Sequence, residues 1–102
     1  MMDIGKRMMR DAIKDGFTLT VYYDSYDDGY YAYKGTDLET SWIHATAVDD
    51  PEILLTKKEG LWTYEQWAFL VHGNDPSETI NDYSVPADGS DNWLQTWCSN
   101  NG

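Results

Sequence analysis

The chain has 102 residues, of which 41% are hydrophobic and 15% aromatic, and its formal net charge at pH 7 is −11. This length accommodates one domain with a single core, and the hydrophobic content argues against a disordered chain. Because binding to phosphates needs clustered cations, the charge argues against DNA or RNA as a direct ligand. The acidic charge can then serve either solubility or the attraction of a basic partner.

The acidic charge is unevenly distributed along the chain. Residues 1–14 have a balance of +2, whereas residues 15–102 hold sixteen acidic residues against Lys34, Lys57 and Lys58. The single cysteine, Cys98, excludes an internal disulfide and a thiolate zinc cluster. No stretch approaches the length of a membrane span, and the start has no secretory apolar core. We therefore expect a cytoplasmic protein with no membrane contact and no cofactor.

Residues 3–15 have the pattern of an amphipathic helix. Ile4, Met8 and Ala12 recur four residues apart, which places them on one stripe of the helix. Gly16 is well placed to end it, because glycine adopts the left-handed conformation of a helix C-terminus. The basic side chains are expected on the solvated face: Arg7, Arg10 and Lys14.

Residues 17–23 alternate apolar and polar side chains, a pattern typical of a strand with one buried face. The acidic turn that follows, residues 24–29, ends in Asp28-Gly29, a dipeptide favoured in hairpins. We predict that residues 30–34 return as the second strand of that hairpin.

A capping box opens a second predicted helix. Thr36 supplies the capping hydroxyl and Glu39 the carboxylate three residues later. The helix is expected to run to about Ala47, with Ile43 adjoining its apolar face, and Pro51 lies just beyond its end. That apolar face comprises Leu38, Trp42 and Ala45.

The next predicted elements are a strand over residues 52–57, a turn at 58–60 and a strand over 61–72. Within the last, the run from residue 67 to 72 is apolar on both of its alternating faces. This pattern predicts a central strand that is covered on both sides.

A more polar strand is expected over residues 79–85, and Asp91 can cap a short C-terminal helix. The order is therefore α-β-β-α-β-β-β-α. We predict one α+β domain with a mainly antiparallel sheet of about five strands and three helices. The C-terminal helix would carry Trp93, Leu94, Trp97 and Cys98.

Metal binding is the first chemistry to consider. Residues 24–29, Asp-Ser-Tyr-Asp-Asp-Gly, superficially match the start of a calcium loop. However, Tyr26 occupies a ligand position, Gly35 stands where the closing glutamate belongs, and the flanks have strand patterns. We interpret the segment as an acidic hairpin turn and expect no specific metal site.

The sequence holds little that indicates catalysis. His44 and His72 have no metal-ligand spacing, and the chain lacks a nucleophile elbow, a phosphate-binding glycine loop and a zinc-protease helix. Either histidine can serve as a general base beside an aspartate, and an enzymatic alternative would pair His72 with Asp75. We expect structural roles for both histidines and no enzyme activity.

The acidic residues are the remaining candidates for function. Many lie in loops or at helix starts, where carboxylates cap amides, but that role does not account for the scarcity of lysine after residue 14. Such an excess steers a cationic partner, and neighbouring Tyr and Trp side chains supply anchor contacts. The predicted partner-binding residues are Asp24, Asp27, Asp28, Asp49, Asp50 and Glu52.

A family resemblance lies in two stretches. Residues 11–16 have the pattern D-A-I-x-x-G and lead into a strand, and residues 70–75 have the pattern L-V-x-G-N-D before I-x-D-Y at residues 80–83. In these respects the chain resembles small phage and prophage proteins without assigned chemistry. The resemblance implies a phage-type source, hence a host-cell cytoplasm, and a small α+β fold. It implies no catalytic residue.

We therefore expect a non-enzymatic accessory protein that binds a basic host protein. In the sharper form of this hypothesis its acidic face imitates nucleic acid and inhibits a host defence or nucleic-acid-processing protein. The alternative is a structural or regulatory domain that self-associates and uses its acidity for solubility, so the sequence leaves monomer and homodimer open. The exposed aromatic residues in that alternative are Tyr30, Tyr31, Trp93 and Trp97.

Overall fold

A computed structural model describes residues 2–23, 31–72, 79–84 and 92–101. It contains three helices and five strands in the order α-β-β-α-β-β-β-α, which confirms the predicted α+β class. The elements are α1 (Ile4–Lys14), β1 (Thr18–Tyr22), β2 (Tyr33–Gly35), α2 (Leu38–Ala45), β3 (Glu52–Glu59), β4 (Trp62–Leu70), β5 (Ile80–Tyr83) and α3 (Trp93–Asn101). Within these residues no helix is long and apolar enough to cross a membrane.

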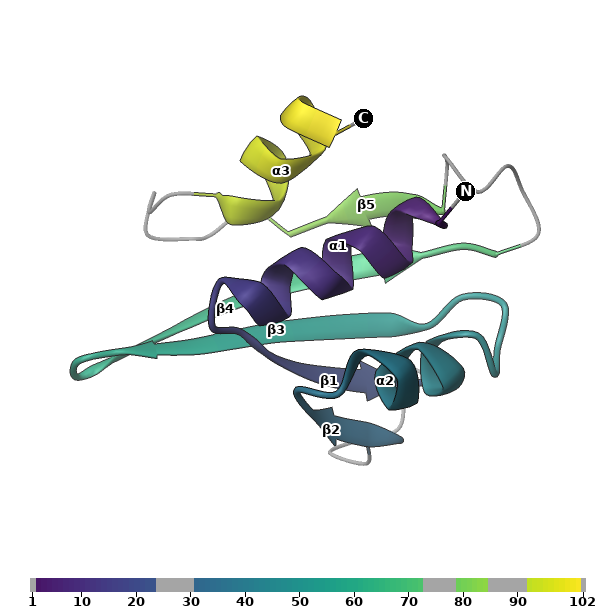
Figure 1. The fold of residues 1–102 in the computed structure, drawn as a ribbon, viewed down its shortest axis with the longest axis horizontal. Coiled ribbons are helices and arrows are strands. Elements are labelled where there is room, and N and C mark those ends of the chain that lie inside the picture. The colour runs from purple at the N-terminus through teal and green to yellow at the C-terminus, as the bar shows by residue number, and fades with distance from the viewer. Residues whose placement is uncertain (1, 24–30, 73–78, 85–91, 102) are drawn as a thin grey trace.

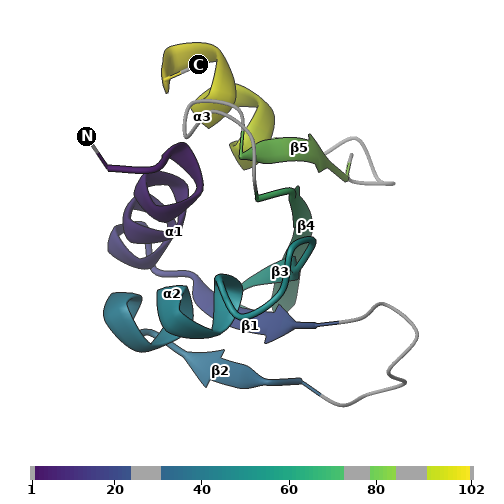
Figure 2. The same ribbon diagram turned by 90° about the vertical axis from the view of Figure 1, so that its right-hand side faces the viewer.

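The five strands form one antiparallel sheet in the order β2-β1-β3-β4-β5. The sheet curves around α1, and all three described helices lie on its concave side (Figures 1 and 2). The core lies between these helices and the sheet. It comprises Ile4, Met8, Met9 and Ala12 from α1, Leu19, Val21, Ile53, Leu55, Ala68 and Leu70 from the strands, and Phe17, Ala45, Leu94 and Trp97.

Both ends of α1 are stabilised by local contacts. Asp3 is the N-cap, and its Oδ1 accepts a hydrogen bond of 2.7 Å from the Gly5 amide. At the other end Gly16 has φ +95°, and the amides of Gly16 and Phe17 donate to the carbonyls of Ile13 and Ala12. These two bonds form a Schellman motif, so the predicted stop at Gly16 is confirmed.

The C-terminal helix α3 is attached to α1 by two tryptophans. The indole Nε1 of Trp93 donates to Asp15 at 2.7 Å, and that of Trp97 donates to Asp11 at 2.8 Å. The two indoles stack with a centroid distance of 6.4 Å. Trp97 is only 7% exposed and Trp93 is half-buried, so the prediction that both are exposed for self-association is wrong.

Replacing Asp11 by asparagine should reduce stability at pH 7 by about 1 kcal/mol, because the Trp97 indole would then donate to a neutral acceptor instead of a charged one. Burial raises the pKa of the Asp11 carboxyl, but the Trp97 hydrogen bond and the Arg10 and Lys14 charges together bring that pKa below its ordinary value. A folded-state pKa below the unfolded one means that the carboxylate stabilises the fold above about pH 4. This contribution is lost as the pH falls through the folded-state pKa.

Urea denaturation of Asp11→Asn and wild type across pH 2 to 7 measures the effect. The stability gap should be widest at neutral pH and close in acid. A gap that stays constant across this range would show that the charge of Asp11 contributes nothing.

The start of α2 differs from the predicted capping box. The N-cap is Asp37, not Thr36, and the Asp37 side chain makes no bond to a helix amide. The Asp37 backbone amide donates to the Tyr33 hydroxyl at 3.0 Å. This bond holds Asp37 directly before the first turn of α2. Glu39, expected to complete the box, instead pairs with Lys6 of α1 at 3.2 Å. The helix ends at Ala45, two residues earlier than expected, and Ile43 is 66% exposed instead of adjoining the apolar face.

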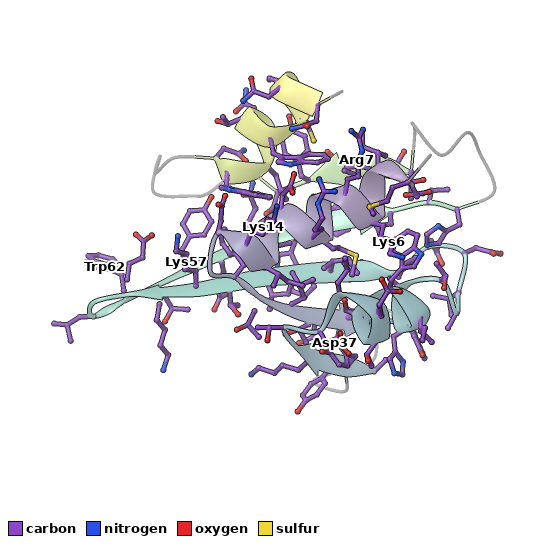
Figure 3. The ribbon with its side chains drawn as sticks, viewed as in Figure 1. Lys6, Arg7, Lys14, Asp37, Lys57 and Trp62 are labelled. Atoms are coloured by element: carbon purple, nitrogen blue, oxygen red, sulfur yellow. The ribbon has the colours of Figure 1, made fainter. Side chains whose placement is uncertain are left out.

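The hairpin of β3 and β4 projects beyond the rest of the molecule (Figure 1). Strand β3 continues to Glu59, so the turn lies at Gly60 and Leu61 instead of the predicted residues 58–60. Gly60 has φ +64° and Leu61 does not have a positive φ, the combination of a type II′ turn. At the tip, Leu61 is fully exposed and Trp62 is 75% exposed, and Trp62 projects from the hairpin as shown in Figure 3.

The C-terminal helix α3 is capped by Asn92, whose Oδ1 accepts the Gln95 amide at 2.9 Å. The predicted cap, Asp91, lies outside the described residues. Strand β5 lies within the predicted residues 79–85, and β2 begins later than the expected residues 30–34.

Candidate binding face

Strand β4 was expected to be covered on both faces, and this prediction is wrong for the described residues. Gln66, Ala68 and Leu70 are buried beneath the helices, whereas Trp67 and Phe69 point to the other side and are half-buried. That side of the sheet has no described helix over it (Figure 2). We call it the open face.

Strand register defines the residues of the open face, because residues directly opposite each other point to the same side. Thr20 lies opposite Lys34 and Leu54, Leu54 opposite Trp67, and Phe69 opposite Glu52 and Asp82. The open face therefore comprises Thr18, Thr20, Tyr22, Lys34, Glu52, Leu54, Thr56, Lys58, Thr63, Glu65, Trp67, Phe69 and Asp82.

The middle of the open face is aromatic. The rings of Tyr22 and Trp67 lie 5.3 Å apart at 44°, and Leu54 is directly opposite Trp67 on the neighbouring strand. Tyr22, Leu54, Trp67 and Phe69 are all half-buried, so each keeps part of its apolar surface in solvent. Adjoining apolar side chains that remain accessible on one face are a common feature of interaction sites.

One end of the open face carries carboxylates. Asp50, Glu52 and Asp82 line a hollow of about 400 Å³ together with Phe69. Asp50 and Asp82 are exposed and Glu52 is half-buried. We call this the carboxylate end. It includes two of the predicted partner-binding residues, Asp50 and Glu52, and adds Asp82.

The other predicted binding residues are placed as follows. Asp49 is exposed next to the carboxylate end, and its carbonyl accepts the His72 amide at 2.7 Å. Asp24, Asp27 and Asp28 lie outside the described residues, as does the candidate calcium loop. Elsewhere in the described chain, no group of three or more His, Cys, Asp or Glu side chains is arranged to hold a metal ion.

The opposite end of the open face is a second hollow, of about 700 Å³. The three lysines found after residue 14, Lys34, Lys57 and Lys58, all line it, and Glu65 is the one carboxylate among the described residues that line it. Lys34 and Lys58 are exposed, whereas Lys57 pairs with Glu59 at 3.6 Å and lies over the Phe17 ring. We call this the lysine end. Its remaining lining is rich in hydroxyls: Thr18, Thr20, Thr56, Thr63, Tyr22 and Tyr31.

Sequence reasoning missed the lysine end and the place of Asp82. The lysines are separated by more than twenty positions, between Lys34 and Lys57, and only the register of β2, β1 and β3 brings them to one hollow. Asp82 joins the carboxylate end because β5 pairs with β4. The sequence shows the period-two alternation of each strand, which tells on which side of the sheet a residue lies. It does not tell which residues of other strands lie next to it.

Both histidines make structural contacts. His44 Nδ1 is 2.7 Å from the Tyr23 hydroxyl, and its ring stacks on Tyr33 with a centroid distance of 5.8 Å. His72 donates from Nε2 to the Ala45 carbonyl at 2.6 Å, and its ring meets Trp42 edge-on. A carbonyl only accepts hydrogen bonds, so this contact holds the Nε2 proton in place. Asp75, the proposed partner of His72 in the enzymatic alternative, lies outside the described residues.

The remaining nucleophile is Cys98 on α3. Burial raises the pKa of the Cys98 thiol, which favours the protonated and poorly nucleophilic form at neutral pH. Comparison with known proteins adds no further candidate: no protein-family model, curated protein or solved structure was found to match this chain.

Proposed function

We propose that the protein acts by binding and that its open face receives a cationic segment of a protein partner. The observation that carries this proposal is the meeting of half-buried aromatic side chains with the carboxylates Asp50, Glu52 and Asp82 on the open face, the side of the sheet that no described helix covers. Aromatic anchors beside complementary charges are typical of energetically important contacts in protein interfaces.

The carboxylate end suits lysine and arginine side chains for two reasons. Its charges attract the cationic head, and the ring of Phe69 in the same hollow offers an apolar surface for the methylene stem. The half-buried indole of Trp67 is available to a guanidinium through cation–π contact, which contributes about 0.5 to 2 kcal/mol. An arginine-rich surface of the partner therefore fits this end best.

In its sharper form, the proposal is that the partner is a host defence or nucleic-acid-processing protein whose cationic groove ordinarily binds phosphates. The net charge of −11 supports this form, because a groove evolved for polyanions attracts an acidic protein by the same long-range field. Asp24, Asp27, Asp28 and Asp49 belong to the proposed contact on the basis of the sequence. This form of the proposal implies a phage-type accessory protein that acts in the host cytoplasm.

A capture experiment from host lysate tests the proposal. The purified protein should retain a basic protein at low salt, release it at high salt and lose it to added DNA if the contact imitates nucleic acid. The variants Trp67→Ala and Asp50→Lys/Asp82→Lys should each weaken retention of that identified protein by at least about tenfold, equivalent to 1.4 kcal/mol.

Matched controls separate the open face from bulk charge and from any exposed tryptophan. Glu39→Lys changes the charge on α2, on the helix side of the sheet, and Trp62→Ala removes the tryptophan at the hairpin tip. Both should retain the partner as wild type does. Glu39→Lys and the single variant Asp82→Lys change the net charge by the same amount. Equal loss of binding in these two variants would show that net charge, not this face, accounts for retention.

A further inference from the structure

We propose that the open face also pairs with a second copy of the chain around a two-fold axis, and that this pairing competes with the basic partner. The competition rests on the proposed function, whereas the pairing itself does not. Charge is unevenly distributed on the open face. Lys58 lies toward the hairpin tip and Lys34 on the edge strand β2. Glu52 and Asp82 lie toward the other end of the strands and the β5 edge, and the aromatic residues lie between the two groups.

The two charged ends are separated along β3. Lys58 and Glu52 are both on the open face, six residues apart, which corresponds to about 20 Å at 3.3 Å per residue. The exposed charged side chains are Lys34, Lys58 and Glu65 at the lysine end, and Asp50 and Asp82 at the carboxylate end. Because one end is cationic in a chain of net charge −11, the face is electrically bipolar and not uniformly acidic.

A bipolar face complements itself. Because Lys34 lies level with Leu54 on the edge strand β2, the two-fold axis between the two facing sheets has to run obliquely across the strands. Such an axis brings Lys34 and Lys58 of each copy over the carboxylate end of the other. The charges at both ends of the face are then paired with opposite charges, as expected for an isologous interface in which the same patch serves both subunits. An external acidic or basic partner would satisfy only one end.

The apolar residues occupy the right place for such a pairing. The level of Leu54 and Trp67 lies between Lys58 and Glu52 along the hairpin, so these side chains fall near the two-fold axis and meet their own counterparts. Two sheets that pack face to face lie about 10 Å apart, with interdigitating side chains between them. The surface of Trp67 and Phe69 that is left in solvent would be buried there.

The size of the face determines the strength of pairing. Five strands spaced about 4.8 Å apart, the longest of them nine residues or about 30 Å long, present at most about 700 Å² per copy. Stable specific interfaces bury about 800 Å² per partner, and smaller ones are transient. We therefore infer a reversible dimer with a dissociation constant in the micromolar range, which a tighter basic partner displaces.

Sedimentation of the purified protein between about 1 µM and about 1 mM tests the pairing, because this span covers weak to moderate affinities. Wild type should show a monomer–dimer equilibrium. Lys34→Glu/Lys58→Glu and Asp50→Lys/Asp82→Lys should each weaken dimer formation at least tenfold, since like charges then face each other. An equimolar mixture of the two double variants should recover dimers, because the opposite charges are again brought together in the mixed pair.

Charge changes on the helix side of the sheet provide the control. Lys14→Glu mixed with Glu39→Lys alters charges on the helix side and should leave the equilibrium of each variant unchanged. A wild-type monomer across the whole range overturns the inference, and so does a failure of the mixture to recover dimers. The readout needs no partner: a strict monomer that still captures a basic protein leaves the proposed function standing, and a dimer that captures nothing removes only that function.

Discussion

Replacing Gln66 by alanine should lower the free energy of unfolding by about 3 kcal/mol, because the groups that are hydrogen-bonded to its amide would lose their partner and a cavity would form. Gln66 has no exposed surface. Its Oε1 accepts the Leu94 amide at 3.1 Å and the Tyr64 hydroxyl at 3.0 Å. Its Nε2 donates to the Ser84 carbonyl at 2.7 Å and also contacts Asn92 Oδ1. This one amide therefore joins β4, the end of β5 and the start of α3.

Chemical denaturation of two further variants separates the polar from the steric contribution of Gln66. Gln66→Met keeps most of the volume and removes every hydrogen bond, so most of the loss should remain. Gln95→Ala, at an exposed position of α3, should change stability by less than about 0.5 kcal/mol. If Gln66→Met were as stable as wild type, the amide network would not be what holds α3 to the sheet.

Replacing Trp97 by alanine should cost about 3 to 5 kcal/mol, the usual range for truncation of a buried tryptophan. Trp97 is 7% exposed, stacks on Trp93 and donates to Asp11 from its indole. Trp97→Phe retains an aromatic ring but loses the donor and part of the area, so about 1 to 2 kcal/mol is expected. Thermal and urea unfolding measure both changes.

A double-mutant cycle isolates the contact between α1 and α3. Trp97→Phe removes the donor and Asp11→Ala removes the acceptor of one hydrogen bond, so their combined cost should be smaller than the sum of the single costs. Strict additivity would mean that Trp97 acts through packing alone. Hydrogen exchange of the α3 amides in Trp97→Ala then tests whether the helix detaches before the rest of the fold opens.

The elements of this fold were predictable where one local pattern decides them. The four-residue spacing of Ile4, Met8 and Ala12 predicted α1, and Gly16 predicted its end, because both signals lie within the helix itself. The alternation after Phe17 predicted β1 for the same reason. Alternation likewise predicted two apolar sides for β4, but whether a helix covers a side depends on elements distant in the sequence.

Errors arose where a distant contact decides between local options. Thr36 and Asp37 are both suitable helix caps, and the Tyr33 hydroxyl that binds the Asp37 amide selects the latter. Trp93 and Trp97 have polar neighbours in the sequence, and their carboxylate acceptors, Asp15 and Asp11, lie at the other end of the chain. No short-range pattern reports such pairs.

The candidate site was predictable in part. The acidity of Asp50 and Glu52 was visible in the sequence, and both lie at one end of the open face. The lysine end was not, because no local pattern shows that the three lysines after residue 14 lie close together. Strand pairing concentrates those few lysines in one hollow, which reverses the charge locally.

The strand order has a consequence for how the protein folds. Each of the hairpins β1–β2 and β3–β4 forms between neighbours in the sequence, but the pairing of β1 with β3 joins residue 22 to residue 52 and residue 18 to residue 56. Closing this long loop is the slow step that topology imposes on the sheet. During synthesis β1 and β2 leave the ribosome before β3, so one edge of β1 stays unpaired until the later residues arrive. Crowding of nascent chains at that stage favours pairing between molecules along this edge, and early association with a chaperone would protect it.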